Sequence, residues 1–198
     1  IWTSQRHYDR IPRTSEDGGT EYHYIRSNYN RLHVVQLNDN ELSLTQTIQE
    51  ISSGYRQETL TADTNTLFLS LNYREEESTT DNRFYTRLHT YRRLEDGSLE
   101  PWVEIPTAGP IQDQYKVRRN NNIISTVSLP NSRNGRPAGN AATQLENFEI
   151  VDGTARKISQ VDLAPGESLF ATRFSGDLAY IVTFLRKDPL FAIDLSDP

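Results

Sequence analysis

Histidine and carboxylate side chains are the groups in this 198-residue sequence best suited to metal binding or acid–base chemistry. The histidines are His7, His23, His33 and His89. A neutral imidazole binds transition metals, and it exchanges protons near neutral pH. None of the four belongs to an HExxH sequence, and no EF-hand loop or closely spaced His/Asp set accompanies them. We therefore expect structural or surface roles for them, with no metal and no cofactor.

Carboxylates are numerous, and the run "REEES" at 74–78 is an example. Two carboxyl groups can hydrolyse a glycosidic bond, but only at a separation that a sequence does not give. A charge run of this kind is more typical of a solvated hairpin tip. GxSxG and phosphate-loop sequences are absent as well. The sequence therefore predicts no catalytic residue.

Composition restricts the class of partner. The formal net charge is −6, and nucleic acids and anionic membranes do not attract an acidic protein, so we expect no nucleic-acid partner. No apolar run is long enough to span a membrane. The chain has no cysteine, which excludes disulfides and thiolate metal sites. Ten tyrosines and 24% charged residues indicate a folded, strand-rich chain with many half-exposed side chains.

The elements that carry these residues repeat along the chain. Three segments begin alike, reach an acidic turn and then resume an alternation of apolar residues: 31–48, 87–105 and, more weakly, 144–161. Their matching leucines are Leu32, Leu88 and Leu145, spaced by 56 and 57 residues. His33 and His89 share one position of this repeat, and Glu146 occupies it in the third copy. A constant period indicates a repeat architecture.

Tight turns mark the same period. Asp39-Asn40, Asp96-Gly97 and Asp152-Gly153 all tolerate positive φ, which a two-residue turn between right-twisted strands requires. Short polar turns also precede apolar strands in the segments 61–72, 118–128 and 174–184. Further short strands are predicted near 55–60, 114–118 and 168–174. Each repeat therefore reads as inner strand, tight turn, second strand, long loop, third strand, Asp turn and outer strand.

Four-stranded antiparallel units of about this length are typical of β-propeller blades, which cover one another's two faces by stacking around an axis. The sequence predicts an all-β fold, an incomplete β-propeller of about three to four blades. The predicted blades are 1–52 (partial), 53–109, 110–166 and 167–198 (partial). Leu190–Leu195 would be the third strand of the last blade and 196–198 its turn. We expect the chain to be a fragment of a larger propeller.

One segment carries a more specific signal. Residues 171–198, "ATRFSGDLAYIVTFLRKDPLFAIDLSDP", closely resemble the family of secreted bacterial and archaeal proteins with a C-terminal β-propeller domain, which is distantly related to WD40 repeats. The matching residues are Thr172, Arg173, Phe174, Gly176, Asp177, Ala179, Tyr180, Val182, Thr183, Phe184 and 188–198. This resemblance implies an exported protein, secreted or in the cell envelope, and a propeller that continues past residue 198. It implies no activity. The WD dipeptide itself is absent.

Long loops between second and third strands are the predicted functional surface. They are expected at 6–30, 72–85 and 130–143, with a short one at 185–188, all on one face of the disc. The first two contain tyrosines beside arginines, a combination favoured at binding surfaces: Tyr8, Tyr22, Tyr24, Tyr29, Tyr73 and Tyr85. The alternative is that these tyrosines extend the hairpin strands outward and pack on one another.

We therefore expect an exported module that binds a protein or an extracellular ligand through this loop face. The alternative is a hydrolase or lyase acting on carbohydrate or lactone in the central channel. That would need clustered carboxylates or metal ligands on the inner strands near Thr59–Thr61, Lys116–Arg118 and Ala171–Arg173, and these residues favour binding instead. A third possibility is a purely structural repeat of the cell envelope. Unpaired strands at the first and last blades also predict self-association.

Overall fold

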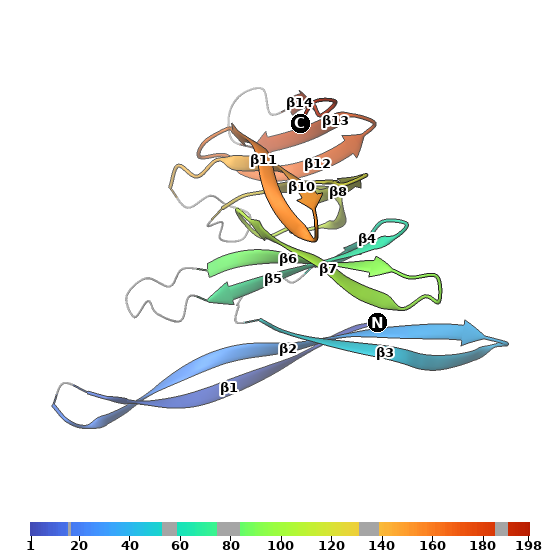
Figure 1. Ribbon diagram of the computed structural model, residues 1–198. Helices are drawn as coiled ribbons and strands as arrows, with labels where there is room; N and C mark the ends of the chain where they lie inside the picture. The colour runs from blue at the N-terminus through green and yellow to red at the C-terminus, as the bar shows by residue number, and fades with distance from the viewer. Residues whose placement is uncertain (16, 53–58, 75–83, 131–138, 185–189) are drawn as a thin grey trace.

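The computed structural model describes residues 1–15, 17–52, 59–74, 84–130, 139–184 and 190–198. These residues form four antiparallel sheets that follow one another along the chain and lie in successive layers in Figure 1. The prediction of an all-β fold built from consecutive antiparallel units is confirmed. Among the described residues, no helix has the length and apolar character needed to cross a membrane.

Strand order within each sheet is the order of the chain. The first sheet contains β1 (Trp2–Thr14), β2 (Thr20–Asn38) and β3 (Glu41–Ser52). The second contains β4 (Thr59–Ala62), β5 (Thr66–Arg74), β6 (Phe84–Arg93) and β7 (Leu99–Thr107). The third contains β8 (Val117–Asn120), β9 (Ile123–Ser128), β10 (Thr143–Val151) and β11 (Thr154–Leu163). The fourth contains β12 (Ser168–Ser175), β13 (Leu178–Phe184) and β14 (Leu190–Asp194).

The predicted Asp turns join the third strand of a sheet to its outer strand. Asp39 and Asn40 have φ of 48° and 67°, and Asp152 and Gly153 have φ of 50° and 73°. Gly97 has φ of 82°. This left-handed backbone lets a short turn match the right-handed twist of the strands it connects. Asp39-Asn40 and Asp152-Gly153 therefore form the predicted two-residue turns, whereas Asp96-Gly97 lie in a longer connection between Arg93 and Leu99.

The strand predicted at 114–118 begins later than expected. Residues Gln114–Lys116 form a short 3-10 helix, and β8 starts at Val117. The Asp113 side chain accepts a hydrogen bond from the Tyr115 backbone N–H at 2.9 Å and pairs with the Lys116 ammonium group. An Asp that caps the backbone in this way competes with strand pairing. Of the strand predicted at 55–60, residues 53–58 lie outside the described part of the chain.

A β-bulge recurs at one position of the repeat. The register between the third and outer strands shifts at Val34/Val35, at His89/Tyr91 and at Asn147/Phe148. In each sheet the outer strand carries one residue more than its partner across the shift. A bulge bends the strand and increases its twist. The repeat thus includes a repeated bend of the outer edge, which the turn pattern alone does not reveal.

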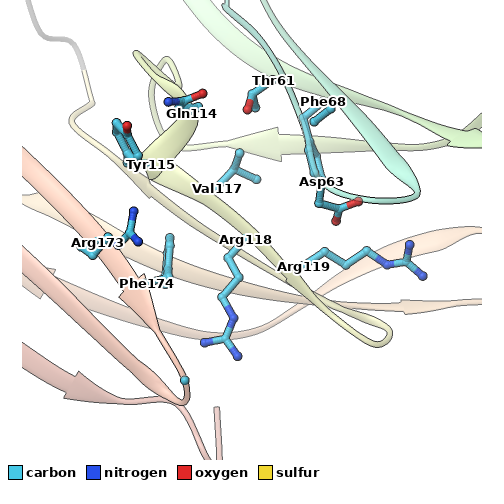
Figure 2. A pocket seen from close by; sticks show the side chains of 12 residues that line it. Thr61, Asp63, Phe68, Gln114, Tyr115, Val117, Arg118, Arg119, Arg173 and Phe174 are labelled. Atoms are coloured by element: carbon cyan, nitrogen blue, oxygen red, sulfur yellow. The ribbon is translucent and has the colours of Figure 1, made fainter.

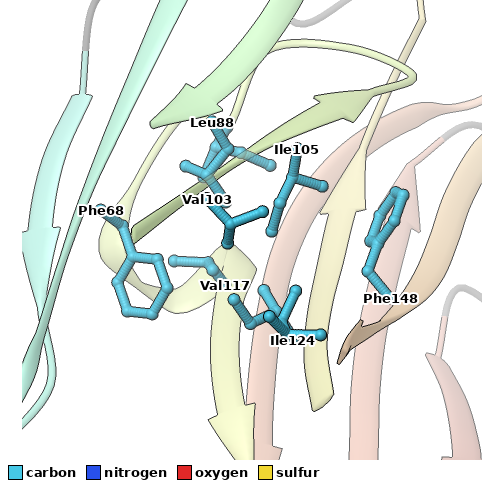
Figure 3. Packing of buried hydrophobic residues seen from close by; sticks show 9 residues of the cluster. Phe68, Leu88, Val103, Ile105, Val117, Ile124 and Phe148 are labelled. Atoms are coloured by element: carbon cyan, nitrogen blue, oxygen red, sulfur yellow. The ribbon is translucent and has the colours of Figure 1, made fainter. Parts of the chain in front are cut away.

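Three buried clusters lie between successive sheets, so the core is divided into three layers. On β5, Leu69 and Leu71 pack toward Leu32 of the first sheet, whereas Phe68 packs toward the third sheet. Figure 3 shows the cluster between the second and third sheets, where Phe68 lies on one side and Phe148 on the other. Both faces of the central sheets are therefore apolar. This explains the near-continuous apolar run at 67–71.

Hydrogen bonds add to this packing between the first two sheets. The Gln46 side chain donates to the Leu99 carbonyl and accepts from the Leu99 backbone N–H, both at 2.8 Å. The Tyr91 hydroxyl donates to Glu50 Oε1 at 2.5 Å. Burial, and then this hydrogen bond to Glu50, raise the pKa of Tyr91. Tyr91 therefore stays protonated and keeps its donor.

Replacement of Ile105 by alanine tests the packing between the second and third sheets. Ile105 is fully buried in the cluster of Figure 3, and its truncation leaves a cavity that the two sheets cannot fill. We expect the free energy of unfolding to fall by about 2–5 kcal/mol, measured by urea denaturation. The control is Leu42→Ala, at a leucine that is 74% exposed, with an expected change within about 0.5 kcal/mol. Equal effects of the two variants would contradict this division of the core.

Tyr91→Phe tests the polar link between the first two sheets. The variant keeps the buried ring and removes the hydroxyl that donates to Glu50. We expect a loss of about 1–3 kcal/mol of unfolding free energy, because a partly buried carboxylate loses a charge-assisted hydrogen bond. Tyr115→Phe is the control, since Tyr115 is exposed. A Tyr91→Phe protein as stable as the wild type would show that water replaces this donor without cost.

Candidate functional site

A two-stranded ribbon extends the first sheet beyond its outer strand. Within the described residues, pairing of β2 with β3 reaches Asn28 and Ser52, whereas pairing of β1 with β2 continues to Thr14 and Thr20. We call residues 7–27, which lie past this point, the arm. Figure 1 shows the arm projecting at the lower left, well past the other strands.

The prediction of a long loop at 6–30 is therefore wrong. The segment is strand up to Thr14 and again from Thr20, and Gly18 between the two strands has φ of 83°. Thr20, Tyr22 and Tyr24 alternate along β2, and these residue types favour strand pairing, which explains the result. Asp17 holds the turn by accepting hydrogen bonds from the Ser15 hydroxyl and, at 3.1 Å, from the Gly19 backbone N–H. These bonds, that from Ser15 first, lower the pKa of Asp17.

Tyrosine and arginine share one face of the arm. Arg10 lies opposite Tyr24 in the register and Pro12 lies opposite Tyr22, with Tyr8 on the same face of β1. The Arg10 guanidinium carbon is 3.4 Å from the centroid of the Tyr22 ring. Tyr8, Tyr22 and Tyr24 are 59%, 45% and 63% exposed. These tyrosines extend the hairpin outward, as the alternative interpretation predicts, yet they remain open to solvent.

The same face is buried nearer the base of the hairpin. By register, Asn28, Asn30 and Leu32 follow Tyr22 and Tyr24 along alternate positions of β2, and all three are buried. Leu32 belongs to the cluster shared with the second sheet. Near the base of the hairpin, this face of the first sheet is therefore buried against the second sheet. The same face continues into the arm, where no described residue covers it.

The remaining predicted tyrosines have other surroundings. Tyr29 lies on the opposite face of β2, with its ring 5.7 Å from that of His7 in an edge arrangement. Tyr73 and Tyr85 face one another across β5 and β6, and only the backbone of Tyr85 is described. The Tyr73 hydroxyl lies 2.6 Å from His89 Nε2. Residues 75–78 of the acidic run, 131–138 of the third predicted loop and 185–188 lie outside the described residues.

The residue at the repeated His/His/Glu position contacts the outer strand of its own sheet, and Glu146 also binds the segment that follows β7. His33 Nδ1 lies 3.0 Å from Thr47 Oγ1 on the outer strand, and His89 Nδ1 lies 3.5 Å from Glu104 Oε1 on the equivalent strand. Glu146 is 1% exposed and accepts hydrogen bonds from Lys157 at 3.0 Å and from the Ala108 backbone N–H at 2.8 Å. Within the described part of the chain, no three His, Asp or Glu residues gather in a way that could hold a metal ion. The His23 side chain is not described.

The predicted inner strands meet at a pocket of about 430 Å³, shown in Figure 2. Of the predicted channel residues, Thr61, Val117, Arg118 and Arg173 line it. Lys116 does not, because it is buried in its ion pair with Asp113. Several lining residues are not among those predicted from the sequence: Ala62, Asp63, Phe68, Gln114, Tyr115, Arg119, Phe174 and Gly176. Most lie within a few residues of the predicted ones, so the strand pattern, extended into each adjoining turn, could have found them.

One carboxylate, Asp63, is present among the described lining residues of this pocket. Its Oδ1 already accepts hydrogen bonds from the backbone N–H groups of Asn65 at 2.9 Å and Thr66 at 2.7 Å. A glycosidase mechanism needs a second carboxyl group on the other side of the bond. The described lining therefore presents arginines and aromatic rings around a carboxylate that is engaged in its own turn.

Two archaeal proteins are similar to short parts of the chain. An uncharacterized protein of Methanocaldococcus jannaschii is 43% identical over 53 residues, which is 26% of this chain and 8% of the relative. An uncharacterized protein of Archaeoglobus fulgidus is 53% identical over 32 residues, which is 16% of this chain and 5% of the relative. Each similarity thus covers less than a tenth of the relative's own length.

A family comparison covers far more of the chain. The sequence model described as "Beta propeller domain" matches residues 5–198, a range that spans all four sheets. The repeat of antiparallel units, the layered core and the earlier resemblance of residues 171–198 agree with this match. The chain therefore belongs to the Beta propeller domain family.

Proposed function

We propose that this propeller module is exported and binds a protein partner through the arm. The observation that carries the proposal is the exposed Tyr/Arg face of the arm, which continues the face buried between the first two sheets. The resemblance of residues 171–198 to secreted propeller proteins supports export. A purely structural envelope repeat has no need of such a face.

The side chains of this face suit a protein interface. Tyrosine and arginine are enriched among interface residues whose truncation costs the most affinity. Tyr8 and Tyr24 are more than half exposed, so a partner can bury a large apolar area on each ring. Arg10 already lies over the Tyr22 ring, which holds its guanidinium in place before a partner arrives. Preorganised groups lose less entropy on binding.

The arm also offers backbone groups. Past Asn28 it consists of two strands only, so β2 has no outer neighbour there among the described residues. A strand edge of this kind can pair with an extended segment of a partner. Side chains on the Tyr/Arg face would then add specificity to main-chain hydrogen bonds. The hydrolase or lyase alternative lacks comparable support, since Asp63 is the one carboxylate among the described pocket-lining residues.

A photo-crosslinking experiment tests the proposal. Benzoylphenylalanine is placed at Tyr24 or, as a matched control, at Leu42, which is 74% exposed on the same sheet. Both proteins are irradiated with an extract of the source organism's envelope and secreted proteins. We expect one discrete adduct from position 24, identified by mass spectrometry, and none of that mass from position 42. The same adduct from both positions would contradict a site on the arm.

The identified partner then allows an affinity measurement. Tyr8→Ser combined with Tyr22→Ser is expected to weaken binding of that partner by about tenfold or more in calorimetry, because two aromatic contacts are lost. Leu44→Ser, at an exposed residue of β3, should leave the affinity unchanged. Unaltered affinity of the double variant would overturn the proposal.

A further inference from the structure

We propose that the pocket between the inner strands binds the anionic group of a small organic ligand. The pocket is formed by three sheets, through β4, β8 and β12 together with the 3-10 helix at Gln114–Lys116. Its volume of about 430 Å³ lies in the range of small-molecule sites. This inference concerns a different region from the arm and does not depend on the proposed protein partner.

The charge of the pocket is opposite to that of the protein. Arg118, Arg119 and Arg173 line it together with one carboxylate, Asp63, whereas the whole chain carries a formal charge of −6. Concave surfaces that gather charge of one sign attract ligands of the other sign. Three arginines from neighbouring sheets in one pocket therefore point to an anion.

Arg118 has unused hydrogen-bonding capacity. Its Nη2 reaches Asp177 Oδ1 at 3.4 Å, a long contact, and Asp177 is 60% exposed. Its Nη1 is buried and has no hydrogen-bond partner among the described residues. A buried donor without an acceptor is costly, and a planar guanidinium prefers two parallel bonds to one anionic group. A ligand carboxylate or phosphate can supply these bonds when the guanidinium rotates toward the pocket and Asp177 turns to solvent.

Arg119 supports the pocket but is already engaged. It donates to Thr66 Oγ1 at 2.7 Å and to the Asn121 carbonyl at 2.8 Å, and its guanidinium lies 4.6 Å from the Trp102 ring centroid. In Figure 2 its side chain extends away from Phe174 and Arg173. Arg119 thus contributes a fixed positive charge, and the direct contacts fall to Arg118 and Arg173.

Aromatic residues form the other wall. Arg173 is exposed, and its guanidinium carbon lies 5.9 Å from the Tyr115 ring centroid. Phe174, the next residue, lines the same pocket and is half-buried. Flat rings beside an arginine suit a ligand with a planar or apolar body attached to its charged group. The expected ligand is therefore a small organic anion and not a bare inorganic ion.

The test uses probes that differ in charge and in the type of anion. Benzoate and phenyl phosphate carry the two anionic groups on one ring, and benzamide is the neutral counterpart of benzoate. Binding is followed by amide chemical shifts in NMR. We expect saturable shifts on β4, β8 and β12 with at least one anion, and at least tenfold weaker binding of benzamide. Preference for benzoate or for phenyl phosphate identifies the ligand's anionic group as carboxylate or phosphate.

Two pocket variants and one control complete the test. Arg118→Gln is expected to weaken anion binding at least tenfold, and Arg173→Gln severalfold, the latter at an exposed residue whose loss leaves the fold intact. Arg156→Gln removes an equal charge from β11, where Arg156 pairs with Glu149 away from the pocket, and should have no effect. Equal binding of benzamide and benzoate, no saturable shift with either anion, or the same loss in Arg156→Gln would overturn the proposal.

Discussion

Burial of both faces of each central sheet, by the sheets before and after it, is the constraint on which this fold depends. No single sheet encloses a core, and each cluster draws its residues from two neighbours. A strand such as β5 must therefore place apolar side chains on both faces, with Leu69 directed to one neighbour and Phe68 to the other. Because each sheet is covered by the next one, the sequence must repeat once for every sheet that is added to the stack.

This constraint explains why so much of the fold can be predicted from sequence. The period of about 56 residues comes from the leucines and turn aspartates, since Leu32 and its equivalents must be buried and Asp39 or Gly97 must adopt positive φ. The bulge on the outer strand repeats equally well, yet no residue type marks it: the shift falls at Val34/Val35 in one sheet and at Asn147/Phe148 in another. Features enforced by side-chain chemistry are visible in a sequence, and features enforced by geometry alone are not.

The candidate sites were harder to predict for two physical reasons. In the arm, the sequence predicts a long connecting loop at 6–30, but the cross-strand register shows that the alternation of Tyr22 and Tyr24 is a strand pattern. In the pocket, Lys116 was expected on an inner strand, but Asp113 caps the chain there and buries its ammonium group. In the arm a strand pattern was read as a loop, whereas at Asp113 a local cap competes with strand pairing.

The strands of a sheet differ in how much they contribute to the core, and this difference explains where the candidate sites lie. Middle strands such as β5 and β9 carry most of the buried residues, and the outer strands contribute links such as Gln46 to Leu99. The inner strands β4 and β8 have four residues each, most of them only half-buried, so they contribute little to the core. Residues that the core does not require can be arginine or threonine without loss of packing. Substitutions on the inner strands and the arm can therefore change the surface chemistry of this propeller. The buried layers between the sheets stay intact.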